Sequence, residues 1–222
     1  QATIWERGQQ LGTLRLSLLG LHNLSNALAV VATARQLGVD FAEIATHLPG
    51  FVGARRRFDR RGFHNDILFV DDYAHHPSEI KVTLAAAKIQ SSEPLASGVE
   101  RRVVAVFQPH RYSRVASLLQ EFATSFSDAD RVIVTDVYSA GEANTTGLNG
   151  QSVADTLAEH HTAVEYAATL ELVQQRLIET LQPGDIAILL TAGNLNRILP
   201  DVIAAHADAS SSTPSMELLS GV

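Results

Sequence analysis

The sequence predicts an α/β fold in which helices cover both faces of an open, mostly parallel sheet. Four short apolar runs rich in strand-forming residues predict strands, and helical periodicity fills the stretches between them. These runs are residues 67–70, 103–107, 131–137 and 186–190. Strands that alternate with single helices are joined by right-handed crossovers and therefore lie parallel. We expect residues 58–207 to form one domain.

The first 56 residues show a separate pattern of one strand and two helices. Alternating leucines predict a short strand within residues 11–19. A helix is expected over residues 22–37, because its apolar residues recur at spacings of three and four. The residues on that apolar face are Leu24, Ala27, Leu28, Val31 and Ala34. Gly38 suits the end of this helix, and a second helix is expected over residues 41–47.

Helices are also expected between and after the four predicted strands. Their ranges are residues 78–88, 113–126, 152–160, 170–181 and 195–205. The helix at 113–126 has the clearest pattern. Its apolar face consists of Val115, Leu118, Leu119, Phe122, Ala123 and Phe126. The polar residues 91–98 predict a loop, and the Ser-rich stretch at 208–222 predicts a disordered tail.

Composition narrows the classes of function. The net charge of −7 over 222 residues argues against a nucleic-acid-binding surface, which needs an excess of Lys and Arg. The chain has no cysteine, which excludes disulfides and thiolate metal sites and suits a cytoplasmic protein. No apolar stretch approaches the roughly 18 residues of a membrane span. Because Gln1 is not Met and no signal-peptide pattern follows it, we expect a cut within a longer chain.

Polar side chains crowd the end of the predicted strand at residues 67–70. Asp71 and Asp72 follow it directly, and then come Tyr73, His75 and His76. The carboxylates could accept hydrogen bonds from a ribose or bind Mg²⁺, and the imidazoles could position an amine or a carboxylate. Alternatively, Ser78 or Asp72 only caps the turn and the histidines are solvated.

A second polar group follows the strand at residues 103–107. His110, Arg111 and Arg114 lie where the next helix is expected to begin. Free N–H groups at a helix start favour an anion, and Arg recognises a carboxylate through paired donors. A small substrate that carries a carboxylate is therefore the expected ligand. The alternative is a basic first turn on a surface helix.

Weaker candidates complete the set. Asn23 and Asn26 project to one side of a helix start, where they could pair with adenine or merely cap the helix. The arginines at 55–57 could reach a nucleotide phosphate or form a solvated linker. Residues 138–142 and 191–194 also follow strands, and a structural role is favoured for both. No glycine precedes a lysine, so the phosphate-binding pattern Gly-x-x-x-x-Gly-Lys-Ser/Thr is absent from the sequence.

Taken in order, these segments resemble the Mur ligases over residues 20–194. The resemblance implies a protein of three domains: one for a UDP-sugar, a central one for ATP and Mg²⁺, and a carboxy-terminal Rossmann-like domain for the amino acid. It assigns residues 1–56 to the helical end of the central ATP-binding domain and 57–207 to the Rossmann-like domain, followed by the tail at 208–222. One departure is Thr191, where the family usually has Gly.

The resemblance also implies a reaction and roles for the site residues. The carboxylate of UDP-N-acetylmuramate would attack ATP to give an acyl phosphate, and the amine of L-alanine would displace phosphate. The Mg²⁺ ligands would lie mostly outside this chain. The implied nucleotide contacts are Asn23 and Asn26 at adenine, Arg57 at the phosphates and Asp72 at the ribose. The implied L-alanine pocket consists of Tyr73, His75, His76, His110, Arg111 and Arg114. The implied catalytic residues are Arg57, Asp72, His75 and His76.

Three other functions remain open at this point. A metal-dependent hydrolase could use Asp71, Asp72, His75, His76 and His110. Adjacent histidines in an extended segment point to opposite faces, however, so His75 and His76 would not easily share one metal. A non-catalytic module that binds a nucleotide or an amino acid is a second alternative, because the phosphate-binding loop is missing. The third is the related ligase that recycles murein peptides.

Overall fold

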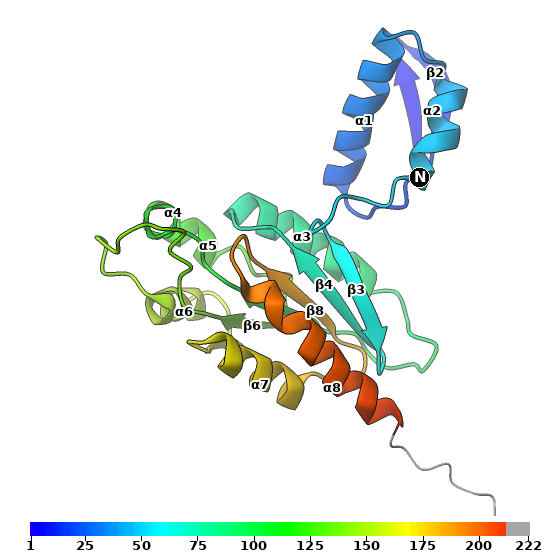
Figure 1. Cartoon of the computed structure of the whole chain (residues 1–222). Coiled ribbons are helices and arrows are strands. Elements are labelled where there is room, and N and C mark those ends of the chain that lie inside the picture. The colour runs from blue at the N-terminus through cyan, green and yellow to red at the C-terminus, as the bar shows by residue number, and fades with distance from the viewer. Residues whose placement is uncertain (212–222) are drawn as a thin grey trace, which may run out of the picture. The chain divides into compact units, whose positions relative to one another are not determined.

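The computed structural model describes residues 1–211, and the chain divides into two compact units, residues 1–57 and the part that begins at Phe58 (Figure 1). The disordered tail expected at 208–222 is wrong for its first residues, because helix α8 continues to Ser211. The remainder of that tail lies outside the described residues. Each unit has its own core.

The first unit packs a hairpin against two helices. Strands β1 (Ala2–Glu6) and β2 (Gln9–Leu14) pair antiparallel. Helices α1 (Leu21–Gln36) and α2 (Phe41–His47) follow, and η1 (Leu48–Gly50) is a 3₁₀ turn. The buried core of the unit consists of Ile4, Leu14, Ala27, Val31, Phe41 and Ile44. The two predicted helices are therefore present, with ends within a residue of those expected.

The strand expected at residues 11–19 is wrong in its extent. β2 ends at Leu14, so Leu16 and Leu18 lie beyond the sheet although they continue the alternation. Its partner β1 was not predicted, because only Ile4 of its five residues is buried. The turn between them puts Arg7 and Gly8 at φ 48° and 82°, which is the conformation of a tight two-residue hairpin.

The second unit is built on a six-stranded sheet of order β3-β4-β8-β5-β6-β7. Only β3 is antiparallel to its neighbour, so the predicted open, mostly parallel sheet is confirmed. The strands are β3 (Asp59–His64), β4 (Ile67–Asp72), β5 (Val103–Phe107), β6 (Arg131–Val134), β7 (Val164–Tyr166) and β8 (Ile186–Leu190). The strands β4, β5 and β8 are buried along their whole length, as expected for a sheet covered on both faces.

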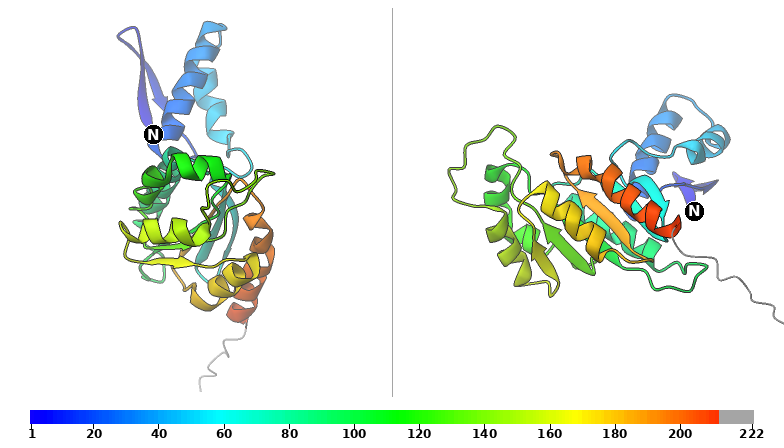
Figure 2. Two further views of the ribbon diagram at one scale, coloured as in Figure 1. Left: turned by 90° about the vertical axis from the view of Figure 1, so that its left-hand side faces the viewer. Right: turned by 60° about the horizontal axis from the view of Figure 1, so that its bottom comes forward.

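Helices cover both faces of this sheet (Figures 1 and 2). One face carries α3 (Pro77–Ser91), α4 (Tyr112–Ser117), α5 (Leu119–Ala123) and α6 (Gly150–Ala158). The other carries α7 (Leu170–Thr180), η2 (Leu195–Ile198) and α8 (Leu199–Ser211). The pleat of β4 explains the two cores: Leu68 and Val70 face the first layer, while Ile67 and Phe69 face the second.

Four expectations for the second unit need correction. β3 and β7 were not predicted, because the first is polar and half-exposed and the second has three residues. The strand expected at 131–137 ends at Val134. The helix expected at 113–126 is interrupted at Leu118, whose φ and ψ of −125° and 20° are not helical. Its apolar residues still pack on the sheet on both sides of the interruption, so the periodicity did not reveal it.

The topology places a switch point at the carboxyl edge of the sheet. The chain leaves β4 and β5 toward the layer of α3 and α4, whereas it leaves β8, which lies between them, toward α8. The loops therefore diverge to opposite faces at this edge. Open α/β sheets bind their ligands at such points.

Candidate functional site

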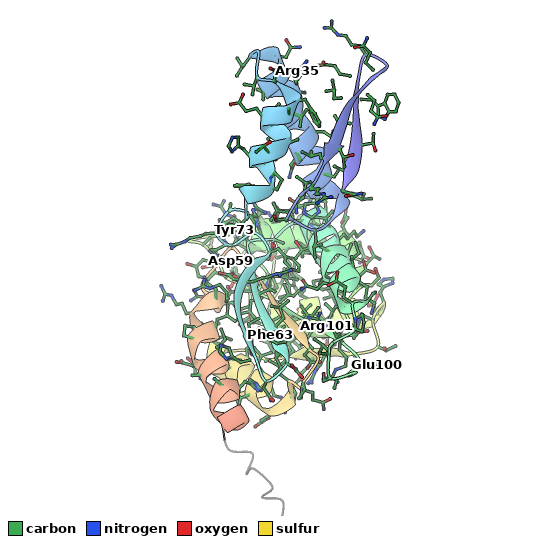
Figure 3. The ribbon with its side chains drawn as sticks, turned by 90° about the vertical axis from the view of Figure 1, so that its right-hand side faces the viewer. Arg35, Asp59, Phe63, Tyr73, Glu100 and Arg101 are labelled. Atoms are coloured by element: carbon green, nitrogen blue, oxygen red, sulfur yellow. The ribbon has the colours of Figure 1, made fainter. Side chains whose placement is uncertain are left out.

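Loops at the carboxyl ends of two strands bring most of the predicted site residues of the second unit together. Tyr73 and His75 follow β4, and His110 and Arg114 follow β5. Tyr138, which was not predicted, follows β6 and joins them. Figure 3 shows Tyr73 at the carboxyl end of the strands. Glu100 and Arg101, which precede β5, lie at the opposite end of the unit. The candidate site therefore lies at the edge that the topology favours.

Four aromatic rings form a continuous row, which we call the four-ring cluster: Tyr73, His75, His110 and Tyr138. The ring centroids of Tyr73 and His75 are 5.2 Å apart, and those of His75 and His110 are 5.7 Å apart, both edge to face. The ring of Tyr138 stacks on His110 at 5.6 Å and 13°. The Nδ1 atom of His75 lies 2.8 Å from the Tyr73 carbonyl oxygen and 3.3 Å from Glu79 Oε2. Both histidines are thus held in fixed orientations.

His110 is held as a neutral imidazole. The Nη1 atom of Arg114 lies 3.2 Å from His110 Nδ1, and since Arg can only donate, Nδ1 must offer a lone pair. Burial lowers the pKa of His110, and the nearby His75, Arg114 and Arg111 lower it further, against an opposing effect of Glu142. The proton of the neutral ring then belongs on Nε2.

A carboxylate does lie at the start of the helix after β5, and it belongs to the protein. Glu142 accepts hydrogen bonds from Ser113 N at 3.1 Å and Ser113 Oγ at 2.8 Å. Its Oε1 lies 3.7 Å from Nη1 of Arg111. The bonds from Ser113 lower the pKa of Glu142, and the charges of Arg111 and Arg114 add to this.

Gln108 fixes the turn that follows β8. Its side chain is 4% exposed, and its Oε1 accepts from Thr191 Oγ1 at 2.6 Å and from the backbone N–H groups of Asn194 and Leu195. The Thr191 hydroxyl in turn accepts from Gly193 N, so the residue that departs from the family pattern closes the turn. A Cβ on Gly193 would lie 2.4 Å from Gln108 Oε1 and 2.7 Å from the Tyr138 ring. The turn therefore packs against Tyr138, at one end of the four-ring cluster.

Sequence reasoning did not include Gln108, Tyr138 or Glu142 among the site residues. Their segments were noticed, but a structural role was favoured for the segment at 138–142. The signal that could have found Tyr138 and Glu142 is their place after β6, a strand of the same parallel sheet, because parallel strands end at one edge.

Two predicted residues are engaged in local structure. Asp72 is 3% exposed, and its carboxylate accepts from the backbone N–H groups of Phe58 and Ala74, both at 2.7 Å. His76 is exposed and caps α3, accepting the N–H of Ser78 at its Nδ1. Asp72 therefore shapes the loop after β4 and joins it to the residue before β3, and His76 shapes the start of α3.

The predicted nucleotide contacts lie in the first unit. Asn23 donates its side-chain N–H to the Leu19 carbonyl at 2.7 Å, while Asn26 is exposed one turn further along α1. Arg57 is exposed and is the last residue of this unit. The start of α1 is formed by Gly20 at φ 94°, so neither asparagine is the N-cap.

The described residues contain no group of three or more His, Cys, Asp or Glu side chains that could hold a metal ion. Residues 1–211 also contain no helix long and apolar enough to cross a membrane.

Comparisons with known proteins agree on one family. Residues 56–194 match the family described as Mur ligase, glutamate ligase domain. The chain is 54% identical over 203 residues to UDP-N-acetylmuramate–L-alanine ligase of Gloeothece citriformis, covering 91% of this chain and 40% of that protein. It is 55% identical over 202 residues to the ligase of the same name from Gloeobacter violaceus, with 91% and 42% covered. The chain thus spans about two fifths of the length of the curated relatives it matches.

Solved structures give the same result. A UDP-N-acetylmuramate–alanine ligase from Thermotoga maritima superposes with a TM-score of 0.71 at 28% identity, covering 90% of this chain and 40% of that one. A murein peptide ligase from Psychrobacter arcticus gives 0.63 at 25% identity, covering 88% and 39%.

Proposed function

The chain belongs to the Mur ligase family, and we propose that it is the amino-acid-binding part of a ligase that joins L-alanine to UDP-N-acetylmuramate. Family membership confirms the resemblance inferred from the motifs. The observation that carries the proposal is the four-ring cluster with Arg111 and Arg114 beside it, at the switch point of the sheet. Relatives that are 54–55% identical bear the name of this ligase.

In the proposed reaction, ATP first converts the carboxylate of UDP-N-acetylmuramate into an acyl phosphate. The amine of L-alanine then attacks the activated carbonyl carbon, the new amide bond forms, and inorganic phosphate leaves. Phosphoryl transfer of this kind depends on positioning and on charge neutralisation rather than on covalent catalysis by the protein. The product is a precursor of peptidoglycan, and we propose a cytoplasmic location, where ATP is available.

This chain's own contribution is to hold the amino acid. Arg111 and Arg114 offer paired donors to the carboxylate of L-alanine, which fixes one end of a small substrate. Tyr73 and His75 are proposed to line the pocket with His110, whose neutral ring adds no charge near the amine. His76, exposed at the start of α3, is proposed to contact the substrate as it enters.

The nucleotide contacts remain proposals for the first unit and its boundary. Asn26 is exposed and can pair with the edge of adenine, with Asn23 beside it, and Arg57 can approach the phosphates. A ribose contact at Asp72 requires the nucleotide to share a carboxylate that already accepts two backbone N–H groups. The ligands of the Mg²⁺ that would neutralise phosphate charge are proposed to lie mostly outside this chain.

A second candidate function is favoured by one observation. The sequence contains no Gly-x-x-x-x-Gly-Lys-Ser/Thr loop, so the chain by itself has no means to cradle the phosphates of ATP. On its own it would act as a binding module without ligase activity. The murein-peptide ligase is the third candidate, supported by the likeness to the Psychrobacter arcticus protein.

A chimera tests the proposal. The chain would replace the matching carboxy-terminal part of the Gloeobacter violaceus ligase, to which it is 55% identical. We expect phosphate release that requires ATP, UDP-N-acetylmuramate and L-alanine together, and none from the chain alone. A folded chimera that prefers a peptide to L-alanine would favour the recycling ligase. Ligation by the chain alone would refute the proposal that this chain only binds the amino acid and needs the rest of the ligase for activity.

A further inference from the structure

We propose that Glu142 is a positioning residue for the amino-acid site: its carboxylate holds Arg111 and the first turn of α4 in the arrangement that receives the substrate carboxylate. The inference rests on the proposed function of that site. Glu142 is the anion that the protein itself supplies at the helix start, and it contacts Ser113 and Arg111 from a different loop.

A tight turn delivers Glu142 to this position. Residues 139–142 close with a hydrogen bond from Glu142 N to Ser139 O at 3.0 Å. The two central residues, Ala140 and Gly141, have φ of 50° and 85°. Positive φ suits Gly but strains Ala, because the Cβ atom crowds its own backbone. The turn is therefore held by its surroundings rather than by local preference.

The other side of the contact is strained as well. Arg111 has φ 69° and ψ 125°, a combination that residues other than Gly rarely adopt. Its N–H donates to the Tyr138 carbonyl at 2.9 Å, and its own carbonyl accepts from Val115 N at 3.1 Å. Glu142 adds the third restraint, because it lies 3.7 Å from the guanidinium of Arg111. Three contacts from two elements thus oppose the strain at a single residue.

Simple helix capping does not explain this arrangement. A Ser, Asp or Asn at the N-cap would satisfy the first turn of α4 without strain. The structure instead has Arg111 at that position, and its side chain makes no cap hydrogen bond. The backbone N–H of Ser113 donates to Glu142, which lies 29 positions further along the chain. Backbone strain of this kind is found mostly where function requires a particular side-chain position. The position that is enforced here is that of the Arg111 side chain, which is half-exposed at the site.

Steady-state kinetics of Glu142→Gln in the chimera test the inference. The amide keeps the size of the side chain but removes the charge, so the KM for L-alanine should rise about three- to tenfold while the KM for ATP changes less than about twofold. Glu171→Gln is the matched control, because it removes a carboxylate of the same size that lies in the first turn of α7, at the other face of the sheet. It should leave both constants unchanged.

An NMR titration of His110 in the 222-residue chain gives a second measurement that separates positioning from folding. Glu142 raises the pKa of His110, so Glu142→Gln should lower it further if the loop stays in place. A variant that merely loosens the site would shift the pKa upward toward the unfolded value. An upward shift, or unchanged kinetics in an active chimera, overturns the inference. A folded wild-type chimera without activity refutes the proposed function instead, and the titration then decides the Glu142 contact alone.

Discussion

At the scale of single residues, the candidate site contains a histidine, His110, whose pKa is lowered by burial and by neighbouring charges. The folded state lowers the pKa of His110 from its ordinary value of 6.5. As the pH falls below about 6.5, the unfolded chain therefore takes up this proton before the folded chain does, and folding becomes less favourable. The stability of the folded state continues to fall until the pH reaches the lowered pKa of His110, where the folded form is protonated too. Below that value the bond from Arg114 to Nδ1 is lost.

The titration of His110 can be measured directly. In the folded chain, its imidazole resonances should titrate at a lower pH than those of the same residue in the urea-unfolded chain. The cause is burial together with the charges of His75, Arg114 and Arg111. His110→Gln identifies the resonance by its disappearance. Titration at or above the unfolded value would mean that the ring is not held as the neutral acceptor of Arg114.

Arg114 should matter for the amino acid and little for ATP. A charged hydrogen bond to a carboxylate is worth roughly 1.5–3 kcal/mol, so Arg114→Ala in the chimera should raise the KM for L-alanine about ten- to a hundredfold. Arg114→Lys should recover part of this, because a point charge cannot reproduce the paired donors. Steady-state kinetics with each substrate varied in turn decide the matter. Arg176→Ala, which removes an arginine of α7 that pairs with Glu165 of β7, serves as the control.

Equal losses for ATP and L-alanine in Arg114→Ala would show that the segment after β5 is not a dedicated amino-acid site. The division between a nucleotide end and an amino-acid end of the active site would then have to be abandoned. The structure adds one further expectation, because Arg114 lowers the pKa of His110. Removing Arg114 should therefore raise it.

At the scale of elements, the sequence predicted those parts whose pattern is set by burial. β5 and β8 begin and end where the apolar runs do. A strand covered on both faces is apolar at every position, so the ends of the apolar run mark the ends of the strand. β3 and β7 lie at the edges of the sheet, where little burial constrains the residues. The interruption of the helix at Leu118 could not be predicted, because the apolar residues on both sides of it continue the helical spacing and pack on the same core.

The site was predictable where it follows a central strand and unpredictable where it depends on long-range contacts. His75 and His110 follow β4 and β5, and the strand-end rule placed both at one edge. The packing of Tyr138 on His110 joins residues 28 positions apart along the chain and depends on how the loop after β6 folds back. No spacing of residues in the sequence predicts that this loop brings Tyr138 onto His110. Glu142 was missed for the same reason.

The turn after β8 should be sensitive to one added methyl group. In Gly193→Ala, the new Cβ would lie 2.4 Å from Gln108 Oε1 and 2.7 Å from the Tyr138 ring, so one of them must move. Overpacking of this kind typically costs about 1–3 kcal/mol, and chemical denaturation followed by circular dichroism would measure the loss. Gly50→Ala is the control, because its Cβ meets nothing within 4 Å. A loss no larger than that of the control would show that the turn adapts and that Gln108 does not hold it rigidly.

At the scale of the whole molecule, two units of unequal size share one chain. The second unit encloses two apolar clusters, one on each face of its sheet. The first has 57 residues and six buried apolar side chains. Small units bury a smaller fraction of their surface on folding and are correspondingly less stable. Several apolar side chains of α1 add nothing to this core, because Leu21 is 84% exposed and Val30 is 50% exposed.

Hydrogen exchange should therefore distinguish the units. Amides in the middle of α1 open through unfolding of a small core, whereas those of β5 and β8 require disruption of the central sheet, so α1 should exchange at least about tenfold faster after correction for intrinsic rates. Mass spectrometry of peptides from the 222-residue chain provides both values in one experiment. Adding 6 M urea supplies the unprotected reference for each peptide. Equal protection of α1 and β8 would show that the chain unfolds as one cooperative whole, and the first unit would then owe its stability to more than its own six-residue core.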